Sequence, residues 1–196
     1  PPMRPLAALL FAALLTACAG GPGRSDDYPQ ATPRTVWIVG PDGRALGQAN
    51  FTGGPHGVLI QLEFSERALP PGWHGLHLHD RGDCSDFAAG FQASGGHLGM
   101  NRRIQHGLMN PEGPEAGDLP NIFAPPSGVF AAEVFAPYVT LSGDRIPGNA
   151  NSRERLPLLD EDGAALLIHV ARDDQVAQPI GNAGARIACA ALTPQP

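Results

Sequence analysis

The order of hydrophobic and polar positions predicts short β-strands joined by turns and long loops. In these segments apolar residues either alternate with polar ones or form short runs that a buried strand would need. The predicted strands cover residues 35–39, 44–52, 58–64, 76–79, 129–135, 138–141, 164–170 and 186–192. No segment requires a helix and no internal repeat is present, so the pattern favours an all-β sandwich or barrel.

Between the predicted strands lie three long segments without a regular pattern. Residues 80–126 are rich in Gly, Pro, Asn and His, and shorter polar loops follow at 143–153 and 171–184. A loop as long as the first is uncommon in a compact domain unless it is functional or held in place. We expect metal ions and a disulfide to hold it.

Composition narrows the class of protein further. The chain has 196 residues, which suffices for one domain with a substantial core. Its net charge is −6, and all 13 basic residues are arginine. The sequence offers no basic patch of the kind that binds nucleic acid, so we expect no nucleic-acid partner.

The N-terminal residues are typical of a targeting segment. Arg4 precedes an apolar run at 6–15, which is too short to span a bilayer. The run ends in Leu-Thr-Ala-Cys, which resembles a bacterial lipobox, so residues 1–17 are predicted to be a lipoprotein signal peptide. Lipidated Cys18 would then anchor the protein to a membrane of the bacterial cell envelope, in the periplasm or at the cell surface. The alternative is an ordinary signal peptide with an incidental cysteine.

Residues 18–33 are rich in Gly, Pro and polar side chains and are predicted to be a flexible tether, followed by the folded domain at 34–196. The chain has three cysteines. Lipidation of Cys18 leaves Cys84 and Cys189 to pair in an oxidising compartment. They are 105 residues apart.

Histidines are concentrated in the motif HGLHLHD at 74–80. His77 and His79 are two residues apart on a predicted strand, so their side chains point to the same face about 7 Å apart and can reach one metal ion. His74 would face the other way. A pair of this kind is weak evidence by itself, since most strand histidines are hydrogen-bonded without a metal.

Further residues strengthen the metal hypothesis. His97, His106 and Asp118 lie in the long loop, and His169 lies in an apolar strand where an unpartnered imidazole would be costly. These are too many imidazoles for a neutral core. Imidazole suits copper and zinc, and carboxylate beside imidazole suits zinc.

The motifs HGLHLH, GGH, the His-Gly in the long loop, AGDLPN, IHV-ARDD and GNAGARIACA occur in this order over residues 34–192. This series closely resembles the copper/zinc superoxide dismutases of the bacterial secreted type. The resemblance implies an all-β Greek-key β-barrel, or flattened immunoglobulin-like sandwich, with long metal-binding and electrostatic loops. It also implies an enzyme that converts superoxide to dioxygen and hydrogen peroxide by redox cycling of a histidine-bound copper.

Position by position, the resemblance implies the following roles. The copper ligands are His77, His79, His97 and His169; the zinc ligands are His97, as the bridging imidazole, with His106 and Asp118; Asp173 links the two sites; Arg186 guards the copper channel; His74 hydrogen-bonds the backbone; and Cys84 pairs with Cys189. The catalytic residues are His97, which would take up and return a proton, and Arg186, which would attract the anion.

One position departs from the family. Glu115 stands where the family has a histidine, three residues before Asp118. A carboxylate can bind zinc, and we favour a zinc site formed by two histidines, Glu115 and Asp118. The alternative is that zinc binding is weak or lost and that the enzyme works with copper alone.

The alternative to the enzyme is a superoxide-dismutase-like protein that binds or carries copper with little turnover. The presence of Arg186 and of all four copper histidines favours the enzyme. Arg102, Arg103 and Arg172 are interpreted as ordinary surface charges, and His56 as a solvated loop histidine. The resemblance is compatible with a monomer and with a homodimer.

Overall fold

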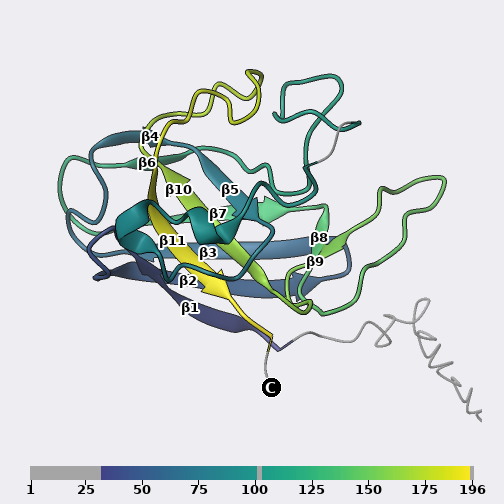
Figure 1. Cartoon of the computed structure of the whole chain (residues 1–196), viewed down its shortest axis with the longest axis horizontal. Helices are drawn as coiled ribbons and strands as arrows, with labels where there is room; N and C mark the ends of the chain where they lie inside the picture. Colours follow the sequence, from purple (N-terminus) through teal and green to yellow (C-terminus); the bar gives the residue numbers. More distant parts are fainter. Residues whose placement is uncertain (1–31, 101–102, 195–196) are drawn as a thin grey trace, which may run out of the picture.

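A curled antiparallel sheet of seven strands, in the order β5-β10-β11-β1-β2-β3-β7, forms the body of the protein in the computed structural model (Figure 1). The structure describes residues 32–100 and 103–194. The strands are β1 (Arg34–Val39), β2 (Ala45–Gly54), β3 (Gly57–Phe64), β4 (Gly72–His74), β5 (Leu76–His79), β6 (Ile122–Ala124), β7 (Phe130–Ala136), β8 (Val139–Thr140), β9 (Leu156–Pro157), β10 (Ala164–His169) and β11 (Arg186–Leu192). The predicted all-β class and the eight predicted strands are confirmed.

Alternation of side chains explains why one face of this sheet is buried. In β3, Ile60, Leu62 and Phe64 point into the core while Gln61 and Glu63 point to solvent. Successive residues of a strand face opposite sides of the sheet, so this pattern buries one face only. The residues that point inward from β1, β2 and β3 form the largest hydrophobic cluster with those of β5, β10 and β11.

β5 and β10 differ because they are buried on both faces. Leu76 and Leu78 of β5 pack into the main core, which leaves His77 and His79 on the opposite face. That second face is covered by the long loop after β5. A polar site can therefore form there, on the face opposite the main core.

Three short strands, β4, β6 and β9, were not predicted from the sequence. β4 and β6 pair with each other, although no strand was predicted between residues 64 and 76 and residues 80–126 were expected to lack regular structure. Three residues are too few for an alternating pattern to be recognised, and the pairing partner is distant in sequence. An edge-to-face contact between Trp73 and Phe123, with centroids 5.3 Å apart, accompanies this pairing.

The long loop also contains two single turns of 3₁₀ helix, η1 (Phe87–Ala89) and η2 (Gln92–Ser94). A disulfide joins Cys84 in this loop to Cys189 in β11, with a Cα–Cα distance of 5.9 Å, which confirms the predicted pair. Figure 1 shows the later part of this loop and the loop after β10 extending beyond the same end of the sheet. The disulfide therefore fixes one end of the loop to the sheet beside the histidines.

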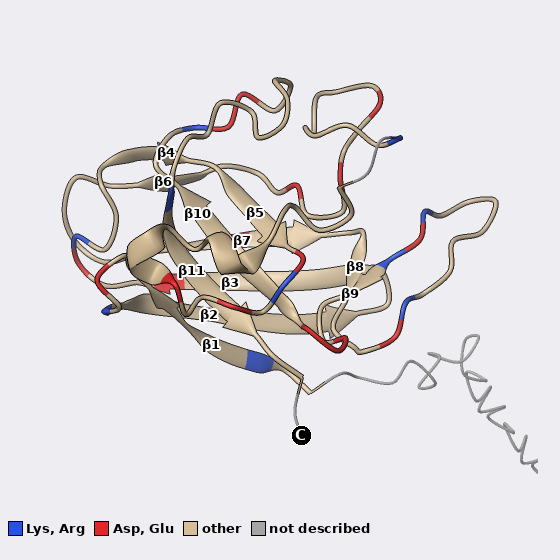
Figure 2. Ribbon diagram, viewed as in Figure 1, with Lys and Arg blue, Asp and Glu red and all other residues tan. Residues whose placement is uncertain are grey.

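Charged side chains do not gather on one element. Figure 2 shows arginines scattered over several loops, with acidic side chains between them, and the described residues present no basic stripe. No helix in the described part of the chain is long and apolar enough to cross a membrane. The predicted signal peptide at 1–17, Cys18 and the tether up to residue 31 lie outside the described residues.

Candidate metal centre

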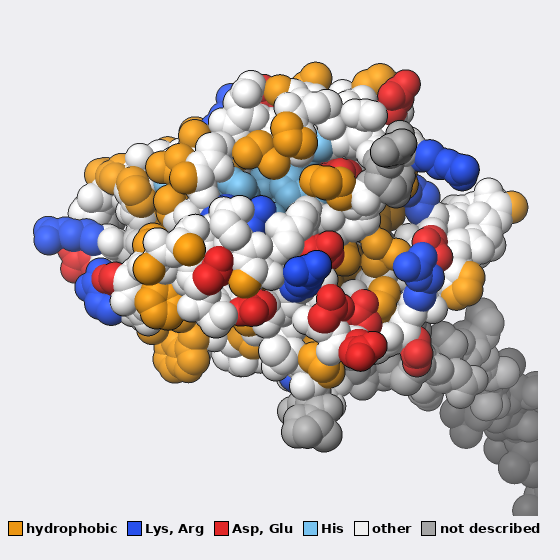
Figure 3. All heavy atoms as spheres, in the orientation of Figure 1, with side chains coloured by type: hydrophobic (Ala, Val, Ile, Leu, Met, Phe, Trp, Pro, Cys, Tyr) orange, Lys and Arg blue, Asp and Glu red, His pale blue; other side chains and the backbone are white. Residues whose placement is uncertain are grey.

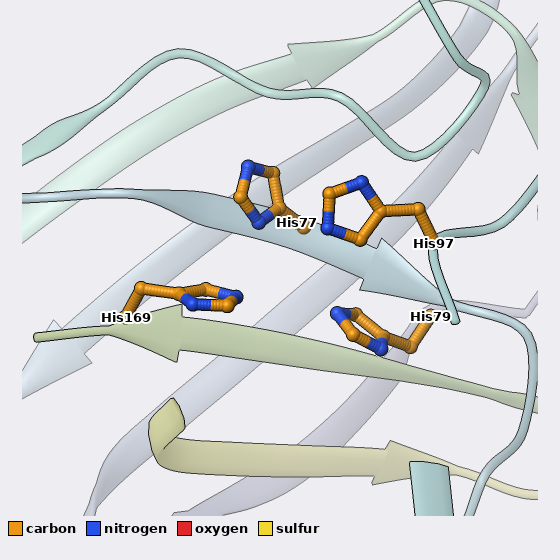
Figure 4. Close-up of side chains that lie close together, drawn as sticks. All are labelled: His77, His79, His97 and His169. Carbon is orange, nitrogen blue, oxygen red and sulfur yellow. The ribbon is translucent and has the colours of Figure 1, made fainter. Parts of the chain in front are cut away.

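Four histidines converge on the covered face of the β5–β10 pair. The strand register places His77 opposite Leu167 and His79 opposite Ala165, so both imidazoles project from the face away from the main core. His169 is two residues after Leu167, at the end of β10, so strand alternation places it on the same face. Figure 4 shows the rings of His77, His79, His169 and the loop residue His97 turned toward a common space.

Backbone pairing with β5 positions the loop residues. Isolated bridges join His79 to His97 and His77 to Asp118, so each strand histidine lies beside a loop residue of the site. Gly117 makes this close approach possible. A Cβ atom at this position would lie 2.3 Å from the carbonyl oxygen of Leu78, so any larger residue would displace the loop.

Each of the four converging histidines has one ring nitrogen occupied and one free. His79 Nδ1 donates to the carbonyl of Gly95 at 3.0 Å, and His169 Nδ1 donates to the carbonyl of Gly184 at 2.8 Å. Because a carbonyl only accepts, these contacts leave the Nε2 of each ring with a lone pair. The buried nitrogens without a partner are His77 Nδ1, His79 Nε2, His97 Nε2 and His169 Nε2.

These free nitrogens have the properties of metal ligands. The ligand atoms offered by the four histidines all lie within 4.8 Å of one another. Burial is the largest cause of a lowered pKa at His77, to about 4, and at His169, to about 3, and it also holds the pKa of His79 well below its usual range. All three imidazoles are therefore neutral at pH 7, the form that binds a metal ion.

A second group adjoins the first and shares His97. His97 Nδ1 lies 2.9 Å from Glu115 Oε2 and 3.6 Å from Asp118 Oδ1. His106 Nδ1 lies 2.8 Å from Asp118 Oδ1 and 3.9 Å from Glu115 Oε2. All four residues are buried, so two imidazoles and two carboxylates meet out of contact with water.

In this group the carboxylates raise the pKa of the histidines, whereas in the first group burial lowers it. Burial alone would lower the pKa of His106, but hydrogen bonds and charge interactions with Asp118 and Asp173 raise it to about 10. The same balance, with Asp118 and Glu115 as partners, raises the pKa of His97. Although burial opposes it, the histidines lower the pKa of Asp118 well below its usual range. The carboxylates of the second group thus favour positive charge beside them, which a bound metal ion could supply.

Asp173 connects the two groups. Its carboxylate lies 2.7 Å from His77 Nε2 and 3.1 Å from His106 Nε2, and the side chain is fully buried. The backbone N–H of Gln175 donates to the same carboxylate at 2.6 Å. Asn121, which sequence reasoning missed, bonds both the N–H and the carbonyl of Asp173. One residue therefore orients a ring in each group.

Arg186 is fixed beside the first group. Its guanidinium donates to the carbonyls of Phe91 and Gly95, at 2.7 and 2.8 Å, and to Ser94 Oγ at 3.1 Å. The charge of Arg186 contributes to the lowered pKa of His79 and His169, so it acts on these rings. Figure 3 shows histidine side chains at the bottom of a surface hollow, with a basic side chain beside them.

The remaining predicted residues lie outside both groups. His74 is buried with its ring nitrogens 2.7 Å from the carbonyl oxygens of His169 and Pro70. His56 and Arg172 are exposed, and His56 lies in the turn between β2 and β3. Arg102 falls outside the described residues. The structure thus brings together the four histidines, the zinc-site candidates, Asp173 and Arg186.

The residues present fit copper and zinc. Four imidazole nitrogens suit copper, and imidazole with carboxylate suits zinc. Donors about 2.0–2.1 Å from one ion lie at most about 4 Å apart, close to the spacing observed here. The four unpartnered nitrogens favour a bound metal most strongly, because buried polar atoms without partners are rare in proteins.

Comparison with known proteins agrees with this geometry. Residues 45–192 match the family described as copper/zinc superoxide dismutase. The chain is 40% identical to a copper/zinc superoxide dismutase of Caulobacter vibrioides over 81% of this chain and 84% of that one. It is 35% identical to a copper/zinc superoxide dismutase of Aquifex aeolicus over 97% of this chain and 99% of that one.

Solved structures show the same similarity. A mutant of a superoxide-dismutase-like protein from Bacillus subtilis superposes with a TM-score of 0.68 at 34% identity, covering 81% of this chain and 97% of that one. The copper/zinc superoxide dismutase of Brucella abortus superposes with a TM-score of 0.56 at 26% identity, covering 82% and 99%. The curled sheet is thus the Greek-key β-barrel of these proteins.

Proposed function

The chain belongs to the copper/zinc superoxide dismutase family, and from this membership we propose that it converts superoxide to dioxygen and hydrogen peroxide. The proposal assigns copper to His77, His79, His97 and His169. The observation that supports it most directly is the set of four unpartnered, buried imidazole nitrogens at metal-ligand spacing.

A bound copper would supply the one-electron redox chemistry that superoxide dismutation requires. The chain holds the ligands for it in advance. Carbonyls fix the tautomer and direction of His79 and His169, and Asp173 does the same for His77. Such partners orient ligands and make them more basic, so the site needs little rearrangement when it binds metal.

His97 is the residue suited to move a proton. Its Nε2 belongs to the first group, while its Nδ1 faces the carboxylates of the second. An imidazole shared in this way can accept a proton at Nε2 and later donate it to a reduced oxygen species, while Glu115 and Asp118 hold its other side. His97 would thus couple proton supply to the chemistry at copper.

Arg186 would attract the anionic substrate. Three hydrogen bonds hold its guanidinium beside the histidines, and the protein as a whole is negatively charged. A fixed local positive charge can focus an anion and raise association rates by about 10–10³-fold. A copper carrier needs no such charge, so Arg186 favours the enzyme over the carrier.

We also propose that zinc is held by His97, His106, Asp118 and Glu115. The two carboxylates give the second group the charge that a divalent cation requires, and they lie 2.9 Å and 2.8 Å from the Nδ1 atoms of the two histidines. Zinc accepts both imidazole nitrogen and carboxylate oxygen at about 2.0–2.2 Å. In this arrangement zinc would fix the orientation of the shared imidazole.

Replacement of His79 by alanine tests the copper assignment. The change removes one of the four nitrogens, and we expect copper binding and superoxide decay to fall together. His56→Ala is the matched control, because it removes an exposed histidine remote from the strand pair. A folded H79A protein with unchanged copper affinity and unchanged superoxide decay would contradict the assignment.

For the N-terminal segment we propose a lipid anchor at Cys18, which would hold the enzyme in the bacterial cell envelope. The support is the lipobox-like Leu-Thr-Ala-Cys sequence after an apolar run. Mass spectrometry of protein from membranes should find a lipidated N-terminal Cys18 and no residues 1–17. Recovery of an unlipidated, freely released chain would show that the signal is an ordinary one.

A further inference from the structure

The two adjoining metal-binding groups differ strongly in donor type. The first offers four imidazole nitrogens. The second offers the imidazoles of His97 and His106 and the carboxylates of Asp118 and Glu115. The family has a histidine at position 115, which would give three imidazoles and one carboxylate. Glu115 therefore makes the second group less like the first.

Glu115 is placed to complete the second group. Its Oε2 lies 2.9 Å from His97 Nδ1 and 3.9 Å from His106 Nδ1, and the residue is only 3% exposed. His77 is also near enough to His97, His106 and Asp118 to be counted with them. However, its Nε2 is occupied by Asp173 and its free Nδ1 belongs to the first group. Glu115 is therefore the better fourth ligand.

Asp118 can contribute a single oxygen to this group. Its Oδ2 accepts the backbone N–H of Gly107 at 2.7 Å and that of Glu115 at 2.8 Å. Its Oδ1 remains directed at the histidines. The second oxygen ligand must then come from Glu115, and the expected donor set is two nitrogens and two oxygens.

Donor type decides which metal such a set prefers. Copper(II) outcompetes zinc at most sites built from nitrogen and oxygen, so proteins separate the two ions through ligand type and geometry. Imidazole is a good copper ligand, whereas carboxylate oxygen is more typical of harder cations. Replacement of an imidazole by a carboxylate therefore reduces the advantage of copper at the second group while it keeps a donor that zinc accepts.

We propose that Glu115 determines metal selectivity, excluding copper from the second group so that copper fills only the four-histidine group and zinc fills its neighbour. This inference rests on the proposed function, since it takes the two groups to be a copper site and a zinc site. Glu115 is thus a specificity-determining residue for metal loading. It would matter most when copper is in excess over zinc.

The test is metal counting on the full-length protein. Metal-free wild type, Glu115→His and Glu115→Gln are exposed to excess Cu²⁺ without zinc, freed of loosely held ions with a chelator, and assayed for copper per chain. We expect one retained copper in wild type and two in E115H. A second copper on the far side of His97 should also couple magnetically to the first and weaken the copper paramagnetic resonance signal of E115H.

Zinc binding gives the second readout. E115Q keeps the shape of the side chain but loses its charge, so we expect its zinc affinity to fall by at least about 10–100-fold, the loss seen when a supporting residue of a metal site is removed. Glu112→Gln is the matched control, because Glu112 is an exposed carboxylate of the same loop. It should behave as wild type in both assays.

Two results would overturn the proposal. The first is that wild type and E115H retain the same number of copper ions per chain after the chelator wash. The other is E115Q binding zinc as tightly as wild type. Neither measurement depends on turnover. If the proposed dismutase activity fails, the protein would still bind copper and zinc in the expected groups but would not accelerate superoxide decay.

Discussion

Asp173 is the side chain whose replacement should disturb both metal-binding groups at once. It contacts His77 Nε2 at 2.7 Å and His106 Nε2 at 3.1 Å from a fully buried position. In the Asp173→Asn variant the negative charge is lost, and the amide N–H₂ group is a poor partner for an imidazole N–H. One ligand of each group then loses the contact that fixes its orientation.

The expected loss of metal affinity in D173N follows from the contacts that Asp173 makes. Loss of an outer partner of a metal ligand typically lowers metal affinity by about 10–100-fold, which is about 1.4–2.7 kcal/mol. Because Asp173 supports one histidine of each group, we expect a loss of this size for copper and for zinc. Replacement of a residue that supported a single site would lower the affinity for one ion only.

Competition with a chelator of known affinity measures both constants on metal-free protein. Asp174→Asn is the matched control: it removes the neighbouring charge, but its exposed carboxylate contacts backbone N–H groups and Asn182 instead of a metal-site histidine. Wild-type affinity for both ions in folded D173N protein would refute the reasoning. A loss for one ion alone would refute the link between the groups.

Three further outcomes follow from the geometry. Arg186→Ala should lower the superoxide decay rate by about 10–10³-fold and weaken its dependence on salt in stopped-flow measurements, and an unchanged salt dependence would argue against anion steering. Replacement of Cys84 and Cys189 by alanine should lower the free energy of unfolding, measured in urea, by up to about 4.7 kcal/mol, and an unchanged value would show that the bridge does not stabilise the fold. Metal-free protein should lose stability in alkali: the pKa of His106 is raised from 6.5 to about 10, so its stabilisation is complete below 6.5 and is lost as pH rises through about 10. Equal unfolding free energies at pH 7 and pH 11 would contradict this last expectation.

The elements that sequence predicted well have a strong local signal. β3 alternates apolar and polar residues, and β10 is a short apolar run, so both are visible in the chain itself. The His77–His79 pair could be placed on one face by the two-residue period alone. The conclusion that these two histidines share a site therefore required only a strand and its alternation.

The features that sequence missed depend on distant contacts. β4 and β6 are three residues each and are separated by the whole metal-binding loop, so neither has a period of its own. The backbone pairing of Asp118 with His77 fixes the second group, yet it depends on the absence of a side chain at Gly117. Asn121, which holds the backbone of Asp173, resembles any loop asparagine until the fold is known.

Glu115 is the position at which the metal-binding residues depart from the family. Sequence identified the substitution and left open whether zinc is retained. The structure adds that the carboxylate is buried and faces the Nδ1 atoms of His97 and His106. These positions convert an exception in a motif into a hypothesis about metal choice.

The central claim is that the chain is a working superoxide dismutase, and the superoxide decay rate of the protein loaded with copper and zinc tests it most directly. We expect a second-order rate constant that approaches the diffusional ceiling of about 10⁸–10⁹ M⁻¹s⁻¹, which enzymes of this class are known to reach. Decay no faster than in buffer, with copper confirmed to be bound, would contradict the account and favour a copper carrier.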